Sequence, residues 1–156
     1  MSKYTVAITW KRDDQVFVDN KFRRLHTWTF DGGIVVPGSS SPHLVPVPES
    51  EPKAVDPEEA FVAALSSCHM LWFLYLAARQ KYCVDSYSDE SVGTMAKNAA
   101  GKLAMTRIVL RPRVAFSGDR VPDQAEFVAL HHDAHAECFI ANSVTTDVVC
   151  EPLLVS

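Results

Sequence analysis

The chain has 156 residues, of which 47% are hydrophobic, and this is enough to form one ordinary hydrophobic core. We therefore expect a single domain over residues 1–156. The formal net charge is −4 and the basic residues are scattered, so nucleic acid is not expected as a partner. The sequence begins MSKYTVAITWK, without the apolar core of a secretory signal, and we expect a cytoplasmic protein.

The first part of the chain is predicted to be a meander of strands. Residues 4–10 alternate apolar and polar side chains, which is typical of a half-buried strand. Further strands are expected at residues 15–19 and 26–30. The sequence Asp31-Gly32-Gly33 predicts a turn into another strand at residues 34–36.

A proline-rich loop is predicted to precede a long helix. Residues 37–57 contain six of the nine prolines, so we expect an ordered loop without regular structure. Asp56 is a suitable N-cap and Pro57 suits the first helical position. The acidic Glu58 complements the positive end of the helix dipole, and the helix is predicted to end near Lys81.

This predicted helix has no formal charge over residues 60–78, which raises the question of a membrane span. Polar residues occupy its centre at positions 66–69, and they would be costly facing lipid, so we expect no membrane association. A helix that is apolar on all sides must nevertheless be buried on all sides. A homodimer that covers the helix from both sides would meet this requirement.

The remaining chain is predicted to add strands around a second helix. One strand is expected at residues 83–95 and a longer one at 103–116, with Pro112 near its middle at an edge or bulge. A second helix is predicted at 122–138 and a last strand at 145–150. The resulting order, βββ-α-ββ-α-β, places the chain in the α+β class.

Cys68 is the strongest candidate for a reactive group, because the sequence lacks a phosphate-binding loop, a dinucleotide fingerprint and HExxH. A cysteine among alanines and leucines also fits an inert core residue. A reactive thiol needs a nearby cation, and Cys68 lies too deep in its helix to gain from the dipole. Arg23 or Arg24 could supply that cation, although either also fits a solvated strand end. Cys83 and Cys150 are interpreted as structural.

A second candidate group surrounds Cys138. His135 and His131 precede it by three and seven residues, so the three side chains share one face of the second predicted helix. Together with Cys68 they could bind zinc. The absence of CxxC and HExxH leaves a histidine and cysteine face without metal as the alternative.

Several segments of the sequence resemble those of the OsmC/Ohr family of thiol-dependent peroxidases. The most specific are DPEEAFVAALSSC, which ends at Cys68, and HAEC, which ends at Cys138. The segments FDGG, SSSPH and CHM resemble an OsmC-like subgroup, and the similarity covers nearly the whole chain. The resemblance implies an OsmC-like α+β fold and an intertwined homodimer.

The resemblance also implies a reaction. Cys68 would reduce an organic hydroperoxide, or hydrogen peroxide, and Cys138 would then form a disulfide with it. Arg24, held by Glu58, would stabilise the Cys68 thiolate. The implied reductant is an external dithiol such as protein-bound dihydrolipoamide, and no bound metal, flavin or nicotinamide is required. An OsmC-like redox sensor or binding protein without fast turnover is the alternative.

The spacing along the helix constrains this arrangement. Glu58 and Cys68 are ten residues apart, which is about 15 Å along an unbroken helix. Either the helix is interrupted, or the Glu58–Arg24 pair reaches Cys68 from the partner subunit. The apolar helix favours the second option, and we expect a site at a homodimer interface.

Overall fold

The computed structural model describes residues 1–155 and has a mixed α+β architecture, as predicted. The internal contacts divide the chain into two compact units, and the boundary between them in the sequence lies between Ala60 and Phe61. Helix α1 contributes to both units, and the single domain expected over residues 1–156 stays a prediction. The elements are β1 (Val6–Thr9), β2 (His26–Phe30), β3 (Val35–Gly38), α1 (Pro57–Arg79), β4 (Cys83–Asp89), β5 (Val92–Lys97), β6 (Leu103–Leu110), β7 (Pro112–Ser117), α2 (Gln124–Glu137), the 3-10 helix η1 (Ala141–Ser143), β8 (Asp147–Cys150) and β9 (Leu153–Val155).

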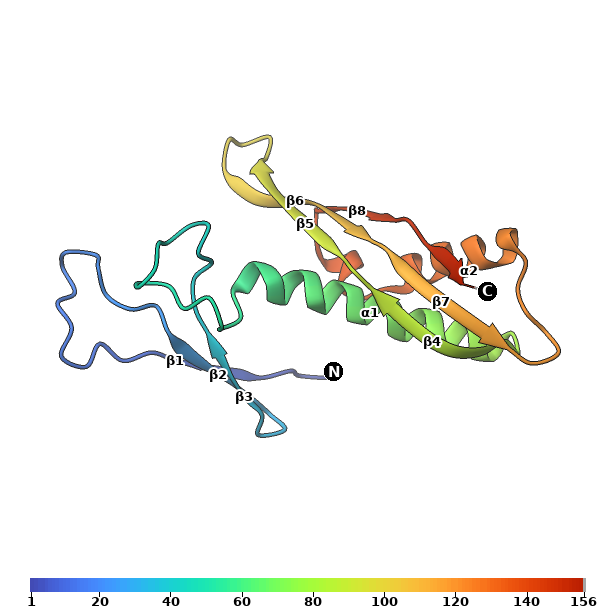
Figure 1. Cartoon of the computed structure of the whole chain (residues 1–156), viewed down its shortest axis with the longest axis horizontal. Coiled ribbons are helices and arrows are strands. Elements are labelled where there is room, and N and C mark those ends of the chain that lie inside the picture. Colours follow the sequence, from blue (N-terminus) through green and yellow to red (C-terminus); the bar gives the residue numbers. More distant parts are fainter. Residues whose placement is uncertain (156) are drawn as a thin grey trace. The chain divides into compact units, whose positions relative to one another are not determined.

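The first unit contains an antiparallel sheet in the order β1-β2-β3 (Figure 1). Three of the four strands predicted here are confirmed, but the strand expected at residues 15–19 is wrong. That segment belongs to a loop in which Asp13 and Asn20 have positive φ values of 50° and 60°. Phe17 of this segment belongs to an aromatic cluster, in which its ring stacks on that of Phe22 with 4.6 Å between the ring centroids. Such packing explains the hydrophobic pattern without strand pairing.

The proline-rich loop after β3 is ordered, as predicted. The backbone N–H of Ser39 donates to the carbonyl of Val55 at 3.0 Å, and the Ser39 hydroxyl accepts from the N–H of Glu51 at 3.0 Å. Ser39 is buried with 1% of its surface exposed. These hydrogen bonds join the two ends of the loop, and α1 begins directly after it.

Helix α1 begins where its capping signals predict. The Asp56 carboxylate accepts from the N–H of Glu59 at 2.8 Å, and the Glu59 carboxylate accepts from the N–H of Asp56 at 3.3 Å. This reciprocal pair satisfies two N–H groups that an uncapped helix would leave unpaired. The helix ends at Arg79, and Lys81 takes a positive φ of 68° just beyond it.

The apolar length of α1 meets the length and composition criteria for a membrane span. One face of the helix, however, packs into the protein, and the Ser66 hydroxyl donates to the Asp89 carboxylate at 2.5 Å. Much of the remaining surface is apolar and open, including Leu71 (61% exposed) and Tyr75 (51% exposed). The buried face is formed by Leu65, His69, Phe73 and Ala77.

The second unit is built on a long ribbon in which β4 pairs with β7 and β5 pairs with β6, all antiparallel (Figure 1). The two strands predicted at 83–95 and 103–116 are each broken in the middle. The break is organised by Asp89, whose carboxylate accepts from the Ser91 hydroxyl at 2.6 Å and the Arg111 N–H at 2.7 Å. The bond to Arg111 joins residues 22 positions apart, so local sequence patterns do not reveal the bend.

Two short parallel strands complete the second unit. β8 pairs with β6, and β9, which was not predicted, pairs with β7. β7 is therefore central in the order β4-β7-β9, and its register with β4 shifts at Val84–Ser86 and not at Pro112, so the predicted edge or bulge position of Pro112 is wrong. Pro112 is tolerated because it is the first residue of its strand.

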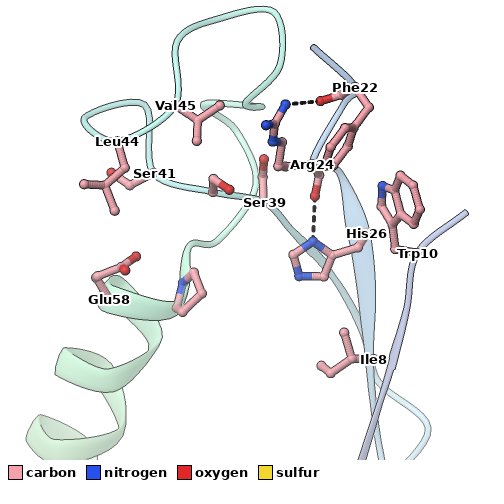
Figure 2. Close-up of a pocket in the computed structure, with 12 residues that line it drawn as sticks. Ile8, Trp10, Phe22, Arg24, His26, Ser39, Ser41, Leu44, Val45 and Glu58 are labelled. Atoms are coloured by element: carbon pink, nitrogen blue, oxygen red, sulfur yellow. Dashed lines mark hydrogen bonds between the residues drawn. The ribbon is translucent and has the colours of Figure 1, made fainter. Parts of the chain in front are cut away.

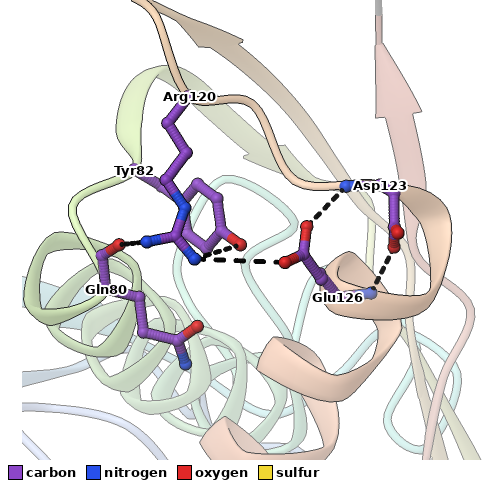
Figure 3. A network of polar contacts seen from close by, with 5 residues as sticks. All are labelled: Gln80, Tyr82, Arg120, Asp123 and Glu126. Atoms are coloured by element: carbon purple, nitrogen blue, oxygen red, sulfur yellow. Dashed lines mark hydrogen bonds and ion pairs between the residues drawn. The ribbon is translucent and has the colours of Figure 1, made fainter.

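A polar network joins the end of α1 to the start of α2 (Figure 3). The guanidinium of Arg120 donates to the carbonyl of Gln80 at 2.9 Å and to the Tyr82 hydroxyl at 3.1 Å, and it lies 3.9 Å from the Glu126 carboxylate. Glu126 and the N-cap Asp123 form a capping box at the start of α2. The network closes the α1 C-terminus with side chains from the loop before α2.

The main core of the second unit lies between the two helices and the β4-β7-β9 sheet. Phe73 of α1 is completely buried there, against Phe127 of α2 and Val114 of β7. A smaller core of Leu65, Ile108 and Leu110 lies beside it.

Candidate functional site

A pocket of about 400 Å³ lies in the first unit (Figure 2). Arg24 and Glu58, both named as candidates from the resemblance, line it together, whereas Arg23 is exposed. Its other lining residues are mostly apolar or small: Ile8, Trp10, Phe22, His26, Ser39, Ser40, Ser41, Leu44, Val45 and Pro57. The pocket thus combines one cation, one carboxylate and an apolar wall.

The two charged groups of the pocket do not form an ion pair within residues 1–155. The Arg24 guanidinium donates to the carbonyl of Phe22 and to the carbonyl and side-chain oxygens of Asn20, at 2.9 and 2.8 Å for the latter two. It also lies 4.0 Å from the centroid of the Phe22 ring. The Oε2 atom of Glu58 is buried without a hydrogen-bond partner among the described residues. A desolvated carboxylate oxygen of this kind is well suited to accept from a cation.

A rigid pair of side chains supports Arg24 and was missed by the sequence analysis. The His26 Nδ1–H donates to the Arg24 carbonyl at 2.7 Å, and the Trp28 Nε1–H donates to His26 Nε2 at 2.6 Å, so both ring nitrogens of His26 have partners. Gly38 on the paired strand makes room for this contact, since a Cβ there would lie 2.3 Å from Trp28 Nε1. Residues 26 and 28 are two apart on a strand and so lie on the same face, and this spacing could have predicted the contact from the sequence.

The two candidate thiols lie together in the second unit. Cys68 is half-buried on α1, and Cys138 is buried at the C-cap of α2 with 1% exposure. The pKa of Cys138 is raised to about 11, mainly by burial and also by the neighbouring Cys68 thiol, while the Ala141 N–H opposes the shift. Cys138 is therefore a protonated thiol at neutral pH, and both cysteines are free.

The predicted zinc ligands are not assembled in the described part of the chain. His131 is turned instead toward His69, whose Nε2 lies 3.0 Å from His131 Nδ1. The ligand atoms that converge among residues 1–155 come from His69, His131 and Cys150, so the set of Cys68, His131, His135 and Cys138 is wrong. Cys83, interpreted as structural, is exposed at the start of β4.

The candidate residues thus form two groups. Arg24 and Glu58 line a pocket in the first unit, and Cys68 and Cys138 lie together in the second. A cation beside a carboxylate can stabilise a thiolate or a polarised oxygen, and two adjacent thiols can form a disulfide. These are the elements of thiol redox chemistry.

Solved structures with this fold include proteins of related description. An OsmC-like protein of unknown function from Vibrio cholerae is 55% identical, with a TM-score of 0.96 over 98% of this chain and 100% of that one. An organic hydroperoxide resistance protein OsmC from Legionella pneumophila is 16% identical, with a TM-score of 0.67 over 100% and 98% of the two chains. The organic hydroperoxide resistance protein OhrB of Bacillus subtilis is 17% identical, with a TM-score of 0.64 over 99% and 98%.

A search of curated proteins gave no match. The family model described as OsmC-like protein matches residues 50–152, which is more than half of the chain and includes Glu58, Cys68 and Cys138. The Legionella and Bacillus structures show that the chain shares their fold. On this match and the likeness to the Vibrio protein, the chain belongs to the OsmC-like protein family.

Proposed function

We propose that this protein is a cytoplasmic thiol peroxidase that reduces organic hydroperoxides with Cys68 as nucleophile and Cys138 as resolving thiol. The observation that carries the proposal is the proximity of the two thiols, one half-buried on α1 and one buried beside it. The described cysteines outside this pair differ in setting, since Cys83 is exposed and Cys150 faces His69. Family membership supports the same chemistry.

The proposed cycle has three steps: oxidation of Cys68 by the peroxide, disulfide formation with Cys138, and reduction of the disulfide. The Cys68 thiolate attacks the terminal peroxide oxygen, the O–O bond breaks, and the departing alkoxide takes a proton to become an alcohol. Cys68 is then a sulfenic acid, which condenses with the Cys138 thiol to form a disulfide and release water. An external dithiol, such as protein-bound dihydrolipoamide, reduces the disulfide by thiol–disulfide exchange, and no bound cofactor enters the cycle.

The pocket of the first unit would supply the activating charge and the substrate wall. Arg24 would leave its contacts with Asn20 and Phe22 and pair with the unpartnered Oε2 of Glu58, because a buried carboxylate oxygen gains most from a charged donor. Its guanidinium would then stabilise the Cys68 thiolate. The apolar lining from Ile8 and Trp10 would contact the alkyl part of the hydroperoxide.

A homodimer would bring these parts together. Helix α1 runs unbroken from Pro57 to Arg79, which removes the interrupted helix as an alternative. The second unit exposes an apolar surface on which Phe139 (67% exposed) packs edge-to-face against Trp72, near the open Leu71 and Tyr75. Apolar surface of this kind favours a protein partner, and a second copy of the chain is the occupant that would also complete the site.

The role of Arg24 can be tested by thiol reactivity. Arg24→Ala is expected to slow alkylation of Cys68 by iodoacetamide about tenfold or more at pH 7, because loss of a nearby cation lowers the thiolate fraction. The rate is measured against pH by mass spectrometry of the Cys68 peptide. Arg23→Ala is the matched control, since Arg23 is exposed and outside the pocket lining. Equal rates in the Arg24 variant and the wild type would remove Arg24 from the mechanism.

The cross-subunit arrangement predicts complementation between two variants that each lack one residue of the proposed site. A heterodimer of one Arg24→Ala chain and one Cys68→Ser chain has one site with both native residues only if each site draws on both subunits. Co-expression with two different affinity tags isolates this species, and we expect about half of the wild-type activity per dimer. Heterodimer activity no higher than that of the Arg24→Ala homodimer would assign the site to a single subunit. Failure to recover any doubly tagged species would contradict the dimer itself.

The function itself is tested by steady-state turnover. Purified protein, cumene hydroperoxide and dihydrolipoamide should give catalytic consumption of the peroxide. Formation of the Cys68–Cys138 disulfide without turnover by any dithiol would instead identify a redox sensor. Absence of both disulfide and turnover would contradict peroxidase and sensor alike.

A further inference from the structure

A second group of chemically active side chains lies in the core of the second unit, apart from the Cys68–Cys138 pair. His69 of α1, His131 of α2 and Cys150 of β8 each offer one ligand atom, and these atoms all lie within 4.8 Å of one another. His69 Nε2 is 3.0 Å from His131 Nδ1 and 3.8 Å from Cys150 Sγ. The two imidazoles are almost fully buried, at 1% and 2% exposure. Three elements distant in sequence therefore direct donor atoms to one point.

The spacing of these atoms fits a tetrahedral metal ion. Zinc–nitrogen bonds of about 2.0–2.1 Å and zinc–sulfur bonds of about 2.3 Å place two nitrogens about 3.3 Å apart and nitrogen and sulfur about 3.6 Å apart. The observed distance from His69 Nε2 to His131 Nδ1, 3.0 Å, is slightly shorter than the nitrogen–nitrogen value. The observed distance from His69 Nε2 to Cys150 Sγ, 3.8 Å, is slightly longer than the nitrogen–sulfur value. Small side-chain adjustments, including an approach of Cys150 toward His131, would complete the geometry.

The environment also favours a cation. Burial lowers the pKa of His69 to about 4 and that of His131 to about 3, so both rings are neutral. The proton that the facing nitrogens now share would move to the outer nitrogen of its ring when both facing nitrogens bind a metal. The Asp89 carboxylate acts electrostatically on both His69 and Cys150 and would stabilise a positive ion between them. Beside the donors, the Phe73 ring stacks 4.2 Å from the His131 ring and the Phe127 ring packs edge-on at 4.7 Å, which fixes the orientation of that imidazole.

A pair of core histidines without metal is the alternative explanation, and it leaves polar atoms unsatisfied. His69 Nδ1, His131 Nε2 and the Tyr87 hydroxyl are all buried without a hydrogen-bond partner among residues 1–155. A single hydrogen bond between two neutral imidazoles offsets little of the cost of burying both rings. Coordination would leave these three outer atoms unchanged, because the metal would bind the two facing nitrogens, but it would replace this one hydrogen bond with two metal–nitrogen bonds.

We propose that His69, His131 and Cys150 bind one zinc-like divalent ion, with a fourth position left for water or a small ligand. Two imidazoles and one thiolate select borderline or soft transition metals and disfavour magnesium and calcium. Cys150 binds as the thiolate, and its proton passes to the buffer. The ion joins α1, α2 and β8 around the main core and is independent of the proposed peroxidase cycle.

Cobalt(II) is a suitable spectroscopic probe for this site. The full-length protein, stripped with chelator and kept reduced, is titrated with cobalt alone. We expect saturation at one equivalent, with a thiolate-to-cobalt charge-transfer band and the visible bands of a tetrahedral ion, followed by displacement with zinc. Cys150→Ser should abolish the charge-transfer band, and His131→Asn should abolish stoichiometric binding.

Two controls separate this site from the other thiols. The double variant Cys68→Ser/Cys138→Ser and the single variant Cys83→Ser should both retain the band, because none of these residues contributes a donor. Circular dichroism shows whether His131→Asn folds, and Cys150→Ser, at a partly exposed position, gives an independent test if it does not. No stoichiometric binding by the wild type, or a band that survives in Cys150→Ser and disappears in the double variant, would overturn the proposal.

Discussion

Cys68→Ser is expected to abolish hydroperoxide turnover, with a fall in kcat/KM of at least about a thousandfold. A serine hydroxyl is not ionised at neutral pH and cannot be oxidised to a sulfenic acid, so the first step of the proposed cycle is lost. The measurement is steady-state consumption of cumene hydroperoxide with dihydrolipoamide. Because the substitution exchanges one atom at a half-buried position, the variant should keep its fold by circular dichroism.

Two further cysteine variants make this result specific. Cys83→Ser should retain wild-type turnover, because Cys83 is exposed on β4 and lies outside the thiol pair. Cys138→Ser should release one equivalent of alcohol as Cys68 becomes a sulfenic acid and, in excess peroxide, a second equivalent as Cys68 is oxidised to the sulfinic acid, and then stop. Substantial steady-state activity in Cys68→Ser would exclude Cys68 as the nucleophile.

The second large effect concerns stability. Phe73→Ala is expected to lower the free energy of unfolding by about 3–5 kcal/mol, because it removes a completely buried ring and leaves a cavity between α1 and α2. This is a large share of the roughly 5–15 kcal/mol that stabilises an ordinary domain. The change is measured by urea denaturation at one fixed protein concentration, since association would add to apparent stability.

Val128→Ala on α2 is the matched comparison for Phe73→Ala. Val128 is 47% exposed, and its truncation should change the free energy of unfolding by less than about 0.5 kcal/mol. A loss below about 1.5 kcal/mol for Phe73→Ala would show that the core between the helices relaxes around the missing ring or contributes less than its burial indicates.

Local signals in the sequence predicted much of the fold. β2 lies where alternation predicts it, at His26–Phe30, and α1 begins at Pro57 behind its Asp56 cap. The capping interactions of α1 lie within a few residues of one another, so pattern and structure have the same cause there. β2 pairs with the more distant β1 and β3, but its own sequence already has the composition of a strand. The α+β class followed from the same elements.

Long-range contacts explain the features that sequence reasoning missed. The break in the long ribbon depends on bonds from Asp89 to Ser66 and Arg111, which are 23 and 22 residues away. β9 is three residues long and is formed by parallel pairing with β7. No local sequence pattern predicts this pairing. The loop at residues 15–19 has a strand-like composition, but aromatic packing and turn geometry determine its conformation.

The candidate site was predictable to a similar degree. Resemblance named Arg24, Glu58, Cys68 and Cys138, and the structure places the first two in one pocket and the last two side by side. The contact between His69 and His131 spans 62 residues, and that between His69 and Cys150 spans 81. A group assembled over such separations is visible only after the chain has folded.

The most direct test of the proposed chemistry is a single turnover followed by disulfide mapping. Reduced protein is mixed with one equivalent of cumene hydroperoxide, remaining thiols are alkylated, and the peptides are analysed by mass spectrometry without reduction. We expect one equivalent of alcohol and one disulfide, between Cys68 and Cys138. A bridge that contains Cys83 or Cys150, or release of alcohol without any disulfide, would contradict the assignment of these two thiols as the reacting pair.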